Sequence, residues 1–220
     1  MNKKVCAIFI AIVSTVSVQA QFTIGVRAGF NLTNILEKDD GKKVNRYEFK
    51  PGFQIGAVGD YAINENFSIQ SGILFATQGA RWKFERTEVG AELIFTETTN
   101  LNYLQIPINA QCRLNLGKAQ LMLQVGTYLG YAISGTIKLE QIRHGGELEK
   151  GKGKIPFGWW QKPYYRNVFD FGLGSGIGVQ FYNFQIGVGY NLGLANLYGF
   201  DKRTEKNMGF ALTATYLFKR

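Results

Sequence analysis

The chain has 220 residues, which fits one domain, and it carries a formal net charge of +9. It contains 27 Gly, 17 Phe and 11 Tyr but only 4 Pro, a composition typical of β-structure. After residue 21 the sequence has no apolar run of about eighteen residues or more. This excludes membrane-spanning helices in that part of the chain.

The first twenty residues differ from the rest. Lys3 and Lys4 precede an almost wholly apolar run over residues 5–18, and Ala20 supplies the small residue of a cleavage site. This pattern predicts a signal peptide for export over residues 1–20, followed by one domain over residues 21–220. The alternative is a buried N-terminal helix. Loss of Lys3 and Lys4 would lower the formal charge from +9 to +7.

Export bears on the stability and partners of the chain. Cys112 is the one cysteine after residue 20, so the exported chain cannot form an intramolecular disulfide. A basic exported protein meets anionic lipid headgroups, lipopolysaccharide phosphates or acidic polymers. Nucleic acid is not expected as a partner after export.

Apolar residues alternate with small or polar residues in eight runs. In the first run, for example, Phe22, Ile24 and Val26 alternate with Thr23 and Gly25. A period of two predicts β-strands with one apolar face. In chain order, the predicted strands span residues 22–32, 53–63, 67–76, 104–114, 120–134, 169–181, 184–194 and 208–218.

The connections between these strands alternate in length. Each run has about ten residues or more, which is enough to cross a bilayer at a tilt of about 45°. Short turns at one end and long loops at the other are typical of transmembrane barrels, with the short turns in the periplasm. Tight turns are predicted at residues 64–66, 115–118 and 182–183, and long polar segments at residues 35–51, 79–100, 135–165 and 197–206.

The second face of the strands distinguishes a soluble barrel from a membrane barrel. It carries Gly, Ala, Ser, Thr, Gln and Asn with few charges, which suits a narrow, packed lumen better than a solvated surface. The apolar face then contacts lipid, where the sheet must close to pair every backbone group. The sequence therefore predicts an all-β protein: an eight-stranded antiparallel up-and-down transmembrane β-barrel with short periplasmic turns and long extracellular loops, in the bacterial outer membrane.

Three segments resemble the PorT-like outer-membrane β-barrel family of Gram-negative bacteria. They are IGVRAGFN at residues 24–31, YLQIPI at residues 103–108 and DFGLGSG at residues 170–176. The resemblance covers essentially the whole chain after residue 20 and implies an outer-membrane barrel. These motifs are loose strand patterns that imply no reaction, although a few members of the family are linked to secretion or gliding machinery.

Four charged residues fall on the predicted lumen face: Arg27, Asp60, Arg113 and Asp170. Buried charges need partners. Arg27 and Asp60 lie on neighbouring predicted strands in the periplasmic half, so we predict a lumen ion pair between them. Such a pair either stabilises a plugged barrel or belongs to a proton or ion path.

The segment over residues 135–165 combines basic and aromatic residues. We expect Lys150, Lys152, Lys154, Trp159 and Trp160 to form a surface-loop binding site. Its ligand would be lipopolysaccharide, a glycan or a protein partner. The alternative is a solvated extracellular loop without a ligand.

The sequence offers little for catalysis. The single histidine, His144, lies in the middle of the longest predicted loop without a serine at close spacing, and one His and one Cys far apart do not predict a metal site. No cofactor is expected either. We therefore expect a monomeric, non-enzymatic barrel with a structural, adhesive or interaction role at the cell surface. Its expected partners are outer-membrane lipid and lipopolysaccharide, and a surface or secretion-machinery protein.

Three other functions stay open at this point. The first is an outer-membrane enzyme that modifies lipid, the second a component of a secretion or uptake system, and the third a pore for small solutes. An eight-stranded lumen is filled by side chains, which argues against the pore.

Overall fold

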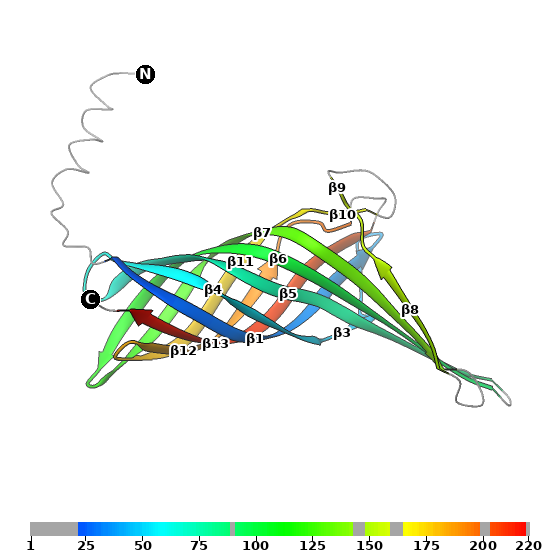
Figure 1. Cartoon of the computed structure of the whole chain (residues 1–220), viewed down its shortest axis with the longest axis horizontal. Coiled ribbons are helices and arrows are strands. Elements are labelled where there is room, and N and C mark those ends of the chain that lie inside the picture. The colour runs from blue at the N-terminus through cyan, green and yellow to red at the C-terminus, as the bar shows by residue number, and fades with distance from the viewer. Residues whose placement is uncertain (1–21, 89–90, 143–147, 159–164, 199–202, 219–220) are drawn as a thin grey trace, which may run out of the picture.

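A computed structural model describes residues 22–88, 91–142, 148–158, 165–198 and 203–218 (Figure 1). The predicted signal peptide, His144, Trp159 and Trp160 lie outside these residues. No helix within the described ranges is long and apolar enough to cross a membrane.

Eight long antiparallel strands close into a ring, which confirms the predicted barrel (Figure 1). Each pairs with the next along the chain, and β13 returns to pair with β1 from Phe218 opposite Ile24 to Thr204 opposite Lys38. Around the ring, the strands are β1 (Phe22–Asp39), β4 (Lys50–Ala62), β5 (Phe67–Glu88), β6 (Ala91–Leu116), β7 (Ala119–Ile142), β11 (Phe169–Phe181), β12 (Phe184–Gly193) and β13 (Thr204–Phe218).

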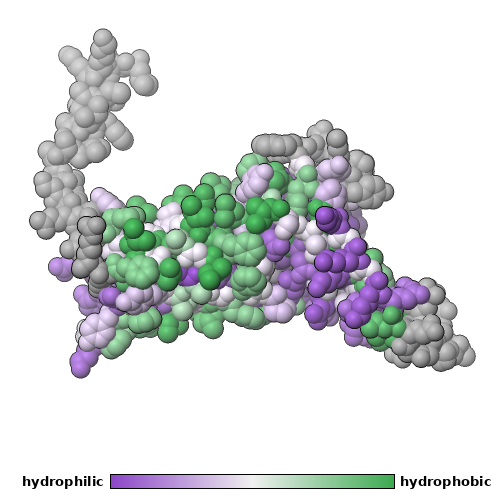
Figure 2. All heavy atoms as spheres, viewed as in Figure 1, coloured by the Kyte–Doolittle hydropathy of each residue, from purple (hydrophilic) through white to green (hydrophobic). Residues whose placement is uncertain are grey.

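The two faces of the strands divide as the alternation predicts. Ile24, Ile108 and Val188 are exposed on the outside, whereas Gln105 and Thr215 are buried on the inside. Apolar residues form a band across the visible face of the barrel (Figure 2), and exposed apolar side chains occur on all eight barrel strands. This band is the surface that a membrane protein presents to lipid.

The short turns lie together at one end of the barrel, with the start of β1 and the end of β13 (Figure 1). The backbone amides of Asn66 and Phe67 donate to the side-chain oxygen of Asn64, which closes the first of these turns. Gly117, with a φ of 75°, provides the left-handed conformation that the second turn needs. These contacts match the predicted turns.

The other end of the barrel is more regular than predicted. β5, β6 and β7 have 22, 26 and 24 residues, against 13 in β4 and 10 in β12. Their outer parts, residues 80–88, 91–101 and 135–142, join β8 (Leu148–Lys154) in a sheet that leans away from the barrel axis (Figure 1). We call this sheet the arm.

The arm corrects the expectation of long loops over residues 79–100 and 135–165. Most of these residues are strand, and only residues 89–90, 143–147 and 159–164 in them fall outside the described ranges. Outside a membrane, a strand carries charged side chains on its exposed face, so its charges resemble those of a loop. The shorter strands at this end are β2 (Lys42–Val44), β3 (Tyr47–Glu48), β9 (Phe157–Gly158) and β10 (Arg166–Asn167).

Two apolar clusters lie inside the barrel. Val58, Leu74 and Leu217 form one in the lumen. The second lies where the arm leaves the barrel, and Ile155 and Leu197 belong to it. Its other buried members are Leu101, Tyr103, Ala132 and Val168.

Candidate functional site

A polar plug fills the lumen near the short turns. Gln70 lies at its centre: its side-chain oxygen accepts from Gln111 at 3.0 Å, and its amide donates to Gln185 at 3.1 Å and to Asp60 at 3.2 Å. All eight barrel strands contribute a side chain to this network. In ring order these are Arg27, Asp60, Gln70, Gln111 with Arg113, Gln124, Gln180, Gln185 and Thr215.

The structure brings Arg27 and Asp60 into this plug but gives Asp60 a different ion-pair partner. Arg113 Nη2 lies 2.5 Å from Asp60 Oδ2. Arg27 instead donates to Thr215 Oγ1 at 2.9 Å and to the side-chain oxygen of Gln70. The predicted Arg27–Asp60 contact is therefore indirect, through Gln70.

The strand register explains this difference. Asp60 lies opposite Thr23, and Arg27 lies opposite Gly56. The offset of four positions from Thr23 to Arg27 corresponds to about 13 Å along an extended strand. Arg27 therefore points into the lumen deeper than Asp60.

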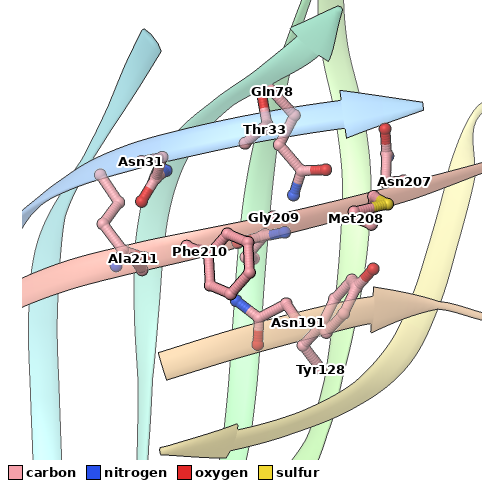
Figure 3. A pocket seen from close by; sticks show the side chains of 12 residues that line it. Asn31, Thr33, Gln78, Tyr128, Asn191, Asn207, Met208, Gly209, Phe210 and Ala211 are labelled. Atoms are coloured by element: carbon pink, nitrogen blue, oxygen red, sulfur yellow. The ribbon is translucent and has the colours of Figure 1, made fainter. Parts of the chain in front are cut away.

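The lumen beyond the plug is narrow. A cavity of about 20 Å³ lies there, and Asn31, Gln78 and Asn207 are among the side chains that line it (Figure 3). Two neighbouring cavities, of about 60 and 10 Å³, reach down to Arg27. Such volumes hold a few water molecules at most. Asp170, the fourth predicted lumen charge, is buried there and accepts from Asn207 at 2.8 Å and Tyr128 at 3.1 Å.

The arm carries cations on its outward face. In one row across the sheet, Arg81 lies opposite Thr98, Thr98 opposite Lys138, and Lys138 opposite Lys152. The predicted site residues Lys150, Lys152 and Lys154 thus belong to a paired strand rather than a loop, and all three are exposed. We define the basic face as Arg81, Lys83, Lys138, Lys150 and Lys152. Lys154, the last residue of β8, also borders the other side of the arm and is not included.

Three carboxylates share this face. Glu85 forms an ion pair with Lys83, and Glu140 lies opposite Lys150. Glu48 lies opposite Arg81 at one end of the central row. Among the described side chains, five cations therefore share the face with three acids, and Lys138 and Lys152 face each other across the strand pair.

A buried ion cluster lies on the inner side of the same end. Glu37 Oε2 lies 3.0 Å from Arg46, and its Oε1 lies 2.9 Å from Arg203. Glu205 contacts Arg203 at 2.6 Å and Arg166 at 2.8 Å. Glu37 and Glu205 are each 1% exposed. These contacts tie the end of β1 to β10 and to the start of β13.

Tyr47 joins this cluster from β3. Its hydroxyl accepts from Arg203 at 3.0 Å and donates to Glu205 at 3.5 Å. Burial, together with the charge of Glu205, raises the pKa of Tyr47 to about 12. The hydroxyl therefore keeps its proton over the physiological pH range.

The sequence patterns do not predict this cluster, although they contain a signal for part of it. The predicted first strand stopped at residue 32. The alternation continues past that point, with Thr33, Ile35 and Glu37 all on the buried face. A carboxylate on the inward row of a strand needs a buried cation, and Arg203 lies far away in the sequence.

A comparison with protein families decides which family the barrel belongs to. The family model described as "Outer membrane protein beta-barrel domain" matches residues 18–199. The chain belongs to this family. A comparison with curated proteins gives no match.

Solved structures similar to this outer-membrane β-barrel include three examples. Ail, the attachment invasion locus protein of Yersinia pestis, is 20% identical with a TM-score of 0.39, and covers 90% of this chain and 99% of its own. Neisserial surface protein A is 13% identical with a TM-score of 0.41, and the match covers 90% of this chain and 99% of that protein's chain. OprG from Pseudomonas aeruginosa is 11% identical with a TM-score of 0.36, and the match covers 91% of this chain and 98% of the OprG chain.

An outer-membrane β-barrel of this kind has its short turns in the periplasm. The turns at residues 63–66, 117–118 and 182–183 therefore face the periplasm. The arm, with its basic face, and the buried ion cluster lie at the extracellular end.

Proposed function

We propose that this protein is a non-enzymatic binding element of the cell surface, and that its basic face binds the phosphate groups of lipopolysaccharide. The observation that carries the proposal is the row of Arg81, Lys138 and Lys152 across the arm. Each basic residue near an anionic membrane surface contributes about 1 kcal/mol of attraction. The expected partners, outer-membrane lipid and lipopolysaccharide, follow from this charge.

The direction in which the arm leans supports this ligand. The basic face continues the outer surface of the barrel wall, because its residues alternate with the inward-facing Trp82 and Ile137. The arm leans away from the barrel axis (Figure 1), and a wall that leans in this way has its outer surface turned back toward the membrane around the barrel. The phosphates of the outer leaflet are then the nearest anions.

The narrow lumen supports a binding role over a pore. The described plug side chains cross the barrel, and the lumen cavities next to them that described residues line are about 60 Å³ or smaller. A hydrated solute does not fit such cavities. A surface or secretion-machinery protein is the second candidate partner, as the resemblance to PorT-like barrels implies.

Lipopolysaccharide binding tests the proposal. The variant replaces Arg81, Lys138 and Lys152 with Gln in protein reconstituted in nanodiscs. The matched control replaces Lys38, Lys42 and Lys43, three exposed cations of β1 and β2 at the same end. We expect the first variant to bind lipopolysaccharide at least tenfold more weakly, and the difference to shrink as salt rises. Equal binding by both variants would refute the proposed face.

We expect the signal peptide to be cleaved near Ala20, so that the mature protein begins at Gln21, which mass spectrometry of the purified protein checks. We also expect labelled lipid A and phospholipid to stay unmodified after incubation with the protein. Turnover of either lipid would favour the lipid-modifying enzyme.

A further inference from the structure

A cavity of about 390 Å³ lies at the extracellular end, on the side of the arm opposite the basic face. Tyr47 and Trp82 line it from one row of β3 and β5, and Tyr198 lines it from the chain that precedes β13. Its size lies in the range of small-molecule sites, which is about 300–1,000 Å³. The cavities of the lumen are far smaller.

The charges around this cavity do not cancel. Arg46, Lys154, Arg166 and Arg203 line it, together with Glu97 and Glu205. Glu37 neutralises one more cation from just outside, through its contacts with Arg46 and Arg203. Four cations thus stand against three carboxylates, so one positive charge remains.

The guanidinium group of Arg166 is one position for this excess positive charge. Its side chain is 10% exposed and lines the cavity, and its contact with Glu205 uses Nη1. Both oxygens of Glu205 are occupied, because Oε1 contacts Arg203. Within the described residues, Arg166 therefore retains donors for a further acceptor. Arg46 is in the same position, since its contact with Glu37 uses Nε.

The aromatic lining indicates what carries the anion. Trp82 and Tyr47 are paired in the register of β5 and β3, so their side chains stand side by side on the inner face. Aromatic faces pack against the C–H faces of sugar rings, while guanidinium groups bind carboxylates and phosphates with two parallel hydrogen bonds. We propose that this cavity binds a single anionic sugar unit, with its ring against Trp82 and its acid group at Arg166 and Arg46. This site is separate from the basic face.

The anion has two chemical sources, a sugar carboxylate or a sugar phosphate. Titration of the full-length protein in detergent micelles with glucuronic acid and with glucose 6-phosphate distinguishes them. Glucose and inorganic phosphate are the controls for ring and charge alone, and isothermal calorimetry is the readout. We expect one of the two acidic sugars to bind at least tenfold more tightly than either control. Equal affinity for glucose, or no heat with either acidic sugar, would overturn the proposal.

Variants assign the binding to this cavity. Arg46→Gln changes a side chain that is 38% exposed, so we expect it to fold and to weaken acidic-sugar binding at least threefold. Trp82→Ala should weaken binding further, and the boiled and unboiled mobilities of both variants check that the barrel has closed. The triple basic-face variant should bind the sugar like the wild type. If the triple basic-face variant lost sugar binding while Arg46→Gln still bound the sugar like the wild type, the sugar would bind on the basic face instead.

Discussion

Arg113 reaches Asp60 over an intervening strand: the two residues belong to β6 and β4, and β5 lies between them. Asp60 is opposite Gln70, and Gln70 is opposite Asn109, which is four residues from Arg113. The long guanidinium side chain spans this offset inside the narrow barrel. Ser68 of β5 accepts from the same Nη2 at 2.9 Å and so supports the pair.

The plug predicts strong energetic coupling between Arg113 and Asp60. Arg113→Ala should cost about 3–5 kcal/mol of unfolding free energy, because it leaves the buried carboxylate without its cation. The double variant with Asp60→Asn should recover part of that loss. Urea unfolding of the protein in lipid vesicles measures both. Strictly additive losses would show that the two residues do not pair.

The comparison with Arg27 is the control for that cycle. Arg27 touches Gln70 and Thr215, so its coupling to Asp60 runs through a shared partner. We expect the Arg27/Asp60 coupling energy to be the smaller of the two. A larger value would favour the direct pair that the sequence alone predicts.

Lipid exposure distinguishes the two ends of one strand pair. Ile108 is 46% exposed in the apolar band, so Ile108→Arg should cost about 2–4 kcal/mol of unfolding free energy if it lies near the bilayer centre. Thr136 lies opposite Asn100 and Lys154 in the arm, outside that band. Thr136→Arg should leave the urea midpoint close to that of the wild type. Equal losses at the two sites would contradict the assigned membrane band.

The buried ion cluster should stabilise the extracellular end. Glu205→Gln removes the carboxylate between Arg166 and Arg203, and should cost about 3–5 kcal/mol because Arg166 is almost fully buried. We expect faster tryptic cleavage near the arm in reconstituted protein. Glu85→Gln is the control, since its partner Lys83 is exposed, and should leave cleavage unchanged. The same cleavage rate in both variants would argue against a stabilising cluster.

The apolar cluster below the arm makes a similar prediction. Ile155 is 7% exposed and packs with Leu101 and Leu197, so Ile155→Ala should cost about 2–5 kcal/mol. The neighbouring Lys154 is exposed, and Lys154→Ala should have little effect on the same urea midpoint. Two equal midpoints would mean that the cluster does not contribute to stability.

The barrel itself could be predicted from the sequence because lipid imposes one simple rule. Outward residues in the membrane are mostly apolar, so alternation shows both strand and facing, as for Ile24 and Arg27. Above the membrane this rule ends. Arg81 and Lys138 are strand residues with solvated side chains, and because of their charges the arm resembles a loop in the sequence.

The ion-pair partners of the buried charges were harder to predict than the strand face on which each charge lies. The sequence placed Arg27, Asp60 and Arg113 in the lumen, but the pairing depends on side-chain reach and strand stagger, which alternation does not encode. The ion cluster joins Glu37 to Arg203, which are far apart in the chain and meet only because β13 closes the ring onto β1. In both cases the contact depends on how distant strands are arranged in space, which no local sequence pattern shows.

Labelling of single cysteines determines whether the basic face of the arm lies on the outside of the cell. In a Cys112→Ala background, Lys152→Cys and Asp39→Cys probe the arm end, while Asn183→Cys probes a short turn. Intact cells are treated with a membrane-impermeant maleimide. We expect labelling at positions 152 and 39, and labelling at position 183 only after the cells are broken. Labelling of Asn183→Cys in intact cells, with Lys152→Cys unlabelled, would mean that the barrel has the opposite orientation and that the basic face lies in the periplasm.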